Sequence, residues 1–143
     1  MEIHKLNMTG FKLKTKDGTE IRFEYYKEAP EKSKVFDRAL PFTQTIMHAR
    51  VSGQELWSDK APKLDVIQEN ASVFAEPGEF VIAPNKPDRN KVKNCLCIFY
   101  GEGKLIDCCN IFASVFDEDF YLLKELGEKI WREGFQEITF ERL

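Results

Sequence analysis

His48 and Arg50 are the two residues of the sequence best suited to act on a small molecule. They stand two positions apart within residues 43–51, where the alternation of side chains predicts a β-strand. On a strand this spacing places both side chains on one face, about 7 Å apart. Arginine offers a planar set of donors to a carboxylate or amide oxygen, and histidine exchanges a proton near neutral pH. The pair therefore predicts a clamp for a small carbonyl compound, with an ordinary salt bridge on a polar face as the alternative.

The same strand predicts which side chains face inward. Positions 43, 45, 47, 49 and 51 carry small or apolar side chains, and we expect this set to face the interior. Gln44, Ile46, His48 and Arg50 then share the opposite face. Gln44 is for this reason included among the ligand-binding candidates.

The four cysteines are expected to pack as small hydrophobic side chains. A hairpin centred on Glu102 would bring Cys95 opposite Cys109 and Cys97 opposite Asp107, with Cys108 on the other face. A C-x-C pair followed by C-C lacks the spacing of a zinc site, and no histidine is near. We therefore expect no metal and no cofactor.

Composition bounds the class of protein. The 143 residues fit one domain, residues 1–143, and the net charge of -3 argues against a nucleic-acid binder. The most basic stretch, 86–93, contains Pro87 and Asp88 and is expected to be a solvated loop. No apolar run reaches the ~20 residues that cross a bilayer, and no secretory signal is visible, so we expect a cytoplasmic protein without a membrane partner.

Several local patterns define the elements that must position the candidate residues. Asp17-Gly18 between two alternating segments predicts a hairpin over 11–25, and Pro30 starts a helix that Pro41 ends. Gly101-Glu102-Gly103 predicts a hairpin between 96–100 and 105–109. A last helix is expected from Asp117, as its cap, to Gly134, with a buried stripe formed by Leu122, Leu123, Leu126, Ile130 and Trp131. About seven or eight strands and two helices predict a closed barrel or sandwich with helices over its ends.

Two parts of the chain resemble the cyclophilin superfamily. Residues 19–26, 28–33 and 36–40 resemble its opening, a strand with an F-E-x-Y-like pattern followed by a helix with a P-K-T-x-x-N-F-x-x-L pattern. Residues 110–115, the last helix and 137–140 are similar to its end. The closer likeness is to small uncharacterised bacterial and archaeal cyclophilin-like proteins of the DUF3830 type, carried by residues 47–53, Trp57, 69–71, 77–80 and 97–101. The resemblance implies a mainly β fold, a closed eight-stranded barrel with two capping helices.

The resemblance also implies further site residues. Beside His48 and Arg50, it implies Glu69 as a catalytic residue that acts as a base or binds an amine. The ligand-binding candidates that it adds are Trp57, Asn70, Tyr100, Asn110 and Phe112. Core packing and solvated loops explain the same residues without a ligand.

Three functions remain open. The first is binding, or conversion, of a small carboxylate, amide or cyclic-amide metabolite in a cleft at the side of the barrel, by analogy with related domains. The second is peptidyl-prolyl isomerisation, although the F-x-x-Q-G-G pattern that follows the working arginine of isomerases is absent after Arg50. The third is a non-catalytic module for peptides or proteins. A homodimer is a further possibility, and the sequence does not decide whether the protein is an enzyme.

Overall fold

The structure is a computed structural model that describes residues 9–86 and 94–143. Apart from Lys86, the basic stretch at 86–93 therefore lies outside the described residues, as do the first eight. The strands are β1 (Gly10–Lys14), β2 (Glu20–Tyr25), β3 (Phe42–His48), β4 (Gly53–Ser58), β5 (Ala71–Phe74), β6 (Glu79–Ile82), β7 (Leu96–Val115) and β8 (Gln136–Arg142). The helices are α2 (Pro30–Ala39) and α3 (Phe120–Glu133), and a short 3-10 turn, η1 (Asp117–Asp119), leads into α3.

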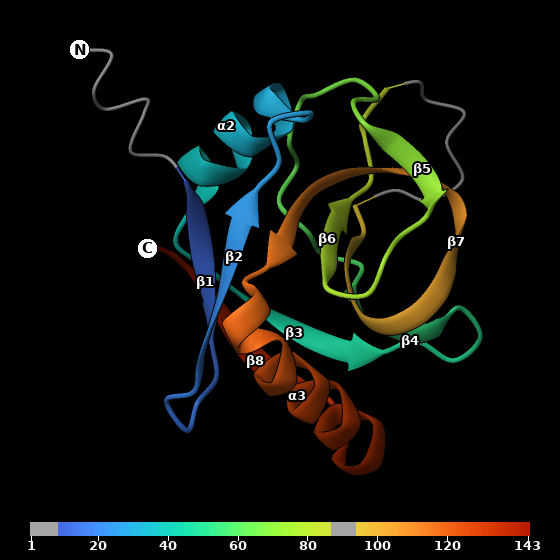
Figure 1. Cartoon of the computed structure of the whole chain (residues 1–143). Helices are drawn as coiled ribbons and strands as arrows, with labels where there is room; N and C mark the ends of the chain where they lie inside the picture. Colours follow the sequence, from blue (N-terminus) through green and yellow to red (C-terminus); the bar gives the residue numbers. More distant parts are fainter. Residues whose placement is uncertain (1–8, 87–93) are drawn as a thin grey trace.

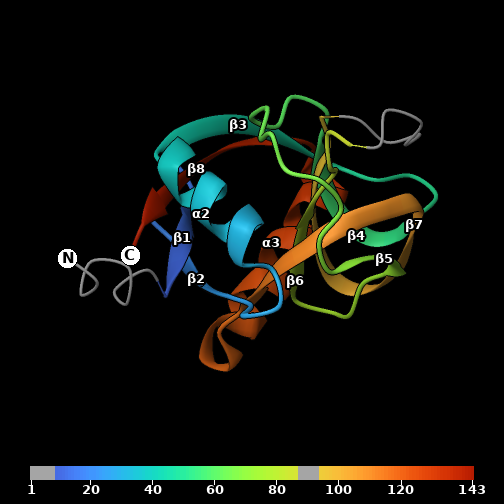
Figure 2. The ribbon, with the colours of Figure 1, turned by 90° about the horizontal axis from the view of Figure 1, so that it is seen from above.

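The strands form one antiparallel sheet that closes on itself. The order β2-β1-β8-β3-β4-β7 is completed by pairing of β2 with β7, which makes a ring of six strands. Strands β5 and β6 pair with β7 outside this closing path. Figure 1 shows β7 curving around β6. Figure 2 shows the strand ring from above. The prediction of a mainly β fold with two helices is confirmed, and the ring holds six of the eight strands.

The first hairpin forms as its alternation predicts. Phe11 pairs with Phe23 and Leu13 with Ile21, so that the apolar side chains of β1 and β2 share one buried face. The rings of Phe11 and Phe23 stack with centroids 5.2 Å apart. They join a large apolar cluster inside the ring that also contains Phe36, Phe80, Phe112 and Phe140. We call this cluster the inner core.

Both helices pack on the sheet by their apolar faces. Helix α2 begins at Pro30 and buries Phe36, and α3 buries Leu123, Leu126 and Ile130 before Gly134, at φ 101°, ends it. In Figure 1, α2 lies at the upper end of β2 and α3 runs below β3. No helix in the described part of the chain is long and apolar enough to span a bilayer.

Two expectations for the last helix are wrong. Trp131 is 63% exposed rather than buried, because it lies one step around the helix from Ile130, beyond the edge of the packed face. Asp117 starts the 3-10 turn instead of capping α3. The aspartate that matters for packing is Asp119, which pairs with the Arg22 guanidinium at 2.8 Å. This hydrogen bond lowers the pKa of the Asp119 carboxyl and ties the start of α3 to β2.

The expected hairpin at Gly101–Gly103 does not form. Residues 96–115 are one long curved strand, and β6 pairs with both of its arms, Val81 facing Cys97 on one side and Ile111 on the other. Cys95 and Cys109 are consequently separated by β6 rather than directly opposed. The glycines do not reverse the chain but let neighbouring backbone come close to β7: a Cβ on Gly103 would lie 2.7 Å from the Ser52 carbonyl oxygen.

The expected inward face of the β3 segment is also wrong. Ile46 is fully buried and joins the inner core, whereas Thr43 and Thr45 are exposed and Val51 is 92% exposed. A strand alternates with a period of two, so one buried side chain decides the orientation of all the others. Here Ile46, the strongest hydrophobe of the segment, decides it.

Candidate functional site

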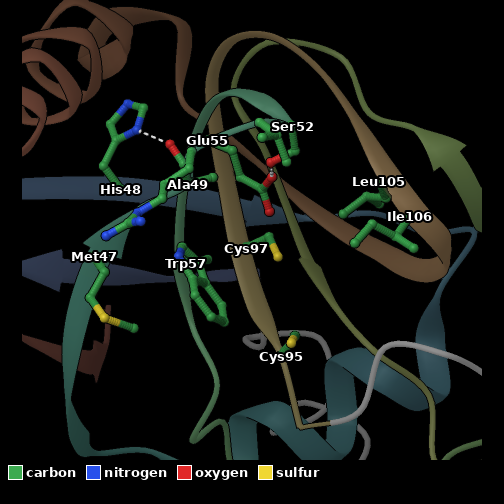
Figure 3. A pocket seen from close by; sticks show the side chains of 12 residues that line it. Met47, His48, Ala49, Ser52, Glu55, Trp57, Cys95, Cys97, Leu105 and Ile106 are labelled. Atoms are coloured by element: carbon green, nitrogen blue, oxygen red, sulfur yellow. Dashed lines mark hydrogen bonds between the residues drawn. The ribbon is translucent and has the colours of Figure 1, made fainter.

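A cavity of about 550 Å³ lies where the end of β3, the strand β4 and the curved middle of β7 meet. This volume is in the range of small-molecule sites. We call it the side cavity. Its lining comprises Met47, His48, Ala49, Arg50, Val51, Ser52, Glu55, Trp57, Cys95, Cys97, Leu105 and Ile106 (Figure 3).

Strand alternation explains which side chains reach the side cavity. In β4, Leu56 faces the inner core, and Glu55 and Trp57 point to the opposite side. Met47 pairs with Trp57, and Trp57 pairs with Cys97, so three neighbouring strands present these side chains to the same space. Leu105 and Ile106 come from the bend of β7. The walls are therefore mainly apolar, with an indole as the largest flat surface.

Glu55 is the one acidic side chain of this lining. It is only 4% exposed, and most of the other lining residues are apolar. The Ser52 hydroxyl donates to its carboxylate, and Figure 3 shows the carboxylate lying between Ser52 and Cys97. Among the described residues, no lysine, arginine or histidine forms an ion pair with Glu55. Burying a carboxylate without a cation is costly, so this burial makes Glu55 a candidate ligand-binding residue.

The thiols of the cavity are held in the protonated state. Burial, followed by the nearby Glu55 charge, raises the pKa of the Cys97 thiol well above its ordinary value of 9.0. Burial likewise raises the pKa of Cys95. A nucleophilic or metal-binding cysteine needs a thiolate, and these environments disfavour one. Within residues 9–86 and 94–143, no group of three or more metal-ligating side chains comes together.

His48 lies at the edge of the side cavity and is engaged at both ring nitrogens. Its Nδ1 is 2.6 Å from the Ala49 carbonyl oxygen, and its Nε2 is 2.6 Å from the Tyr100 hydroxyl. Because a carbonyl only accepts, Nδ1 carries the proton and neutral His48 accepts from Tyr100. The Trp131 ring packs against the imidazole at 4.7 Å between centroids. In Figure 3 the imidazole points away from Glu55 and Cys97.

A glycine in α3 makes room for Tyr100. A Cβ on Gly127 would lie 2.3 Å from Cδ1 of the Tyr100 ring, so only glycine allows this approach of helix and strand. Burial and then Glu128 raise the pKa of the Tyr100 hydroxyl, which stays protonated and able to donate to His48. The helix, the tyrosine and the histidine thus form one connected support for the end of β3.

Arg50 follows His48 in the exposed turn between β3 and β4. It lines the side cavity and also a second cavity of about 400 Å³, which is bordered by Tyr100, Trp131 and Arg132. In the described part of the chain, no carboxylate forms an ion pair with Arg50. Its guanidinium is therefore available to a ligand at the mouth of either cavity.

The structure does not bring Glu69 to the same cavity as His48, Arg50 and Trp57. Glu69 lines a separate depression, and its carboxylate accepts from the backbone N–H groups of Glu31 at 3.2 Å and Lys32 at 2.8 Å. These are orphan donors of the first turn of α2, so Glu69 caps this helix from a distant part of the chain.

The remaining candidates make contacts that hold the fold together. Asn110 is fully buried and binds the backbone of Glu69 and Ile67, at 2.9 and 3.0 Å. Asn70 adopts a left-handed conformation and donates to the Ile111 carbonyl at 2.8 Å. Phe112 belongs to the inner core, and Gln44 accepts from the Ser58 hydroxyl at 3.2 Å. None of these four lines the side cavity.

Sequence reasoning missed Glu55, Ser52 and the cavity walls at Met47, Leu105 and Ile106. Glu55 stands beside Gln54 in a short strand, which is the pattern of a solvent-facing residue. One signal was available in the sequence and was not used: Glu55 and Trp57 stand two positions apart, and on a strand this spacing places the acid and the indole on the same face. Its burial depends on the curvature of β7, which no local pattern contains.

Comparison with known proteins defines the class first. McbB, solved in a complex with tryptophan, superposes with a TM-score of 0.68 at 18% identity over 92% of this chain. The hypothetical protein AF2241 from Archaeoglobus fulgidus gives a TM-score of 0.65 at 19% identity over 94% of this chain and 95% of its own. This chain covers 44% of the McbB chain. The strand ring with its two helices therefore has a cyclophilin-like fold.

The family follows from the sequence itself. Residues 15–142 match DUF3830, described as a protein of unknown function, and the chain belongs to this family. No curated protein matches it.

Proposed function

We propose that this protein binds a small carboxylate or amide compound, cyclic amides included, in the side cavity. The observation that carries the proposal is that a charged side chain, Arg50, and a flat apolar one, Trp57, line one cavity of about 550 Å³ with His48 at its edge. The apolar walls receive the body of the ligand, and Trp57 packs against it. Arg50 binds the carboxylate or carbonyl oxygen at the mouth.

Two further observations support a ligand of this kind. McbB, a neighbour in fold, was solved with tryptophan, a compound with a carboxylate and a flat apolar body. The guanidinium of Arg50, which forms no ion pair with any carboxylate of the described residues, and the indole of Trp57 suit the same two features. Binding is better supported than turnover, because both nitrogens of His48 already have protein partners.

A thermal-shift screen of small carboxylates, amides and cyclic ureas tests the proposal. A ligand that binds only the native state raises the melting temperature by mass action. We expect the shift to be lost in Arg50→Ala and kept in Arg132→Ala, an exposed arginine that borders only the second cavity. A shift that is insensitive to Arg50, or sensitive to Arg132 alone, would contradict binding in the side cavity.

The same screen separates the other functions. A proline-containing tetrapeptide that binds in preference to every small compound would favour an isomerase-like groove. If no compound shifts the melting temperature, the proposal is wrong and a protein-interaction module becomes the better account. Exposed Val51 and Ile106 at the rim of the cavity, 92% and 75% exposed, would then be its contact surface.

A further inference from the structure

We infer that the ligand of the side cavity carries a basic nitrogen, and that Glu55 binds this nitrogen as its charge partner. The inference rests on the proposed function for the location of the site and goes beyond it in the chemistry of the ligand. A carboxylate or amide ligand accounts for Arg50 and leaves the buried end of the cavity unexplained.

The first argument is the environment of the Glu55 carboxylate. Its side chain is buried to 4% exposure among Trp57, Cys97 and apolar neighbours. The partners within reach are neutral donors, the Ser52 hydroxyl and the Cys97 thiol. Neutral donors compensate part of the lost hydration of a carboxylate, and a cation compensates far more. In the described part of the chain, the protein supplies no such cation to Glu55.

The second argument is position. Glu55 reaches the cavity from the centre of β4, whereas Arg50 belongs to the exposed turn that precedes this strand. The two charges of opposite sign therefore line one cavity, Arg50 in an exposed position and Glu55 in a buried one that is only 4% exposed. A ligand with a basic nitrogen at its inner end and an acidic or carbonyl group at its outer end matches this arrangement.

The third argument concerns which ligand binds more tightly, a cation or its neutral analogue. An ammonium group entering an apolar cavity without a partner loses its hydration and binds worse than a neutral analogue of the same size. With a buried carboxylate as partner, the ammonium group forms a charge-assisted hydrogen bond where the local dielectric is low. The cation then binds more tightly than the neutral analogue. The comparison of a cation with its neutral isostere consequently reports on Glu55 directly.

The test uses three probes that share a phenyl ring and differ in their polar end: phenethylamine, 2-phenylethanol and 3-phenylpropionate. Affinities are measured by calorimetry on the wild type, Glu55→Gln, Arg50→Ala and the control Glu102→Gln, an exposed carboxylate outside the cavity lining. We expect phenethylamine to bind the wild type about 10- to 100-fold more tightly than 2-phenylethanol, the range of a hydrogen bond to a charged group. Glu55→Gln should abolish this preference, and Glu102→Gln should keep it.

The outcomes separate this inference from the proposed function. If 3-phenylpropionate binds in an Arg50-dependent way and phenethylamine shows no advantage over 2-phenylethanol, the inference is overturned and the proposed function stands. If no probe binds the wild type, both fail. The comparison of phenethylamine with 2-phenylethanol needs only the wild-type protein, so the test remains decisive even if Glu55→Gln does not fold.

Discussion

The hydroxyl of Tyr100 lies 2.6 Å from Nε2 of His48 and joins the curved strand β7 to the end of β3. Tyr100 is 4% exposed, and its ring packs against Gly127 of α3. The contact therefore connects three elements that are far apart in the sequence. Together with the Ala49 carbonyl on Nδ1, it fixes the orientation of the imidazole at the end of β3, two residues before Arg50.

Tyr100→Phe should lower the free energy of unfolding by about 1–2 kcal/mol, because Nε2 of His48 loses its donor in a half-buried position. Chemical denaturation measures this change. Tyr121→Phe is the matched control, since Tyr121 is 63% exposed, and it should stay within about 0.5 kcal/mol of the wild type. Equal stability of the two variants would show that the hydrogen bond contributes nothing.

Glu69→Ala should destabilise the protein by about 1 kcal/mol, since it removes the acceptor of two N–H groups at the start of α2. Ligand affinity in the side cavity should not change, because Glu69 lies outside its lining. Denaturation and calorimetry on one sample measure both quantities. A loss of ligand binding with unchanged stability would show that Glu69 contacts the ligand and would contradict its role as a cap of α2.

Lys32 gives a prediction about pH. It is fully buried, its Nζ donates to the Ala83 carbonyl at 3.4 Å, and burial lowers its pKa from 10.5 to about 8. Between these two pH values the unfolded chain binds the extra proton, so Lys32 makes the free energy of unfolding rise with pH. Below pH 8 the charged amine opposes folding.

Lys32→Met should therefore be more stable than the wild type at pH 7, by about 1–3 kcal/mol. The advantage should shrink as the pH rises from 8 to 10.5, because over this range the amine is neutral in the folded chain and still protonated in the unfolded chain. Above pH 10.5 the amine is neutral in both states. Denaturation of both proteins across this range measures the difference. A difference that is independent of pH would contradict a perturbed Lys32.

Short sequence patterns were sufficient to predict the first hairpin and the end of the last helix. Asp17-Gly18 between two alternating segments predicted the first hairpin, and Gly134 marked the end of α3. The path of β7 was not predictable in this way. Gly101 and Gly103 have the composition of a turn, and they serve a close approach to Gln54 and the Ser52 carbonyl that only the folded chain defines.

The candidate site was predictable in part for the same reason. The spacing of His48 and Arg50, together with the family resemblance that pointed to Trp57, identified residues that do line one cavity. Glu55 was missed because its burial comes from β7, more than forty positions away along the chain. The interior orientation of β3 depended on Ile46 alone, and a one-residue shift in an alternating pattern exchanges the two faces.

The most direct measurement of ligand binding uses the two tryptophans as reporters. Trp57 lines the side cavity, whereas Trp131 packs on His48 and borders the second cavity. In two-dimensional NMR spectra, titration with 3-phenylpropionate should shift the indole N–H signal of Trp57 and leave that of Trp131 in place, and Arg50→Ala should abolish the shift. A titration that moves only Trp131, or neither indole, would contradict the account.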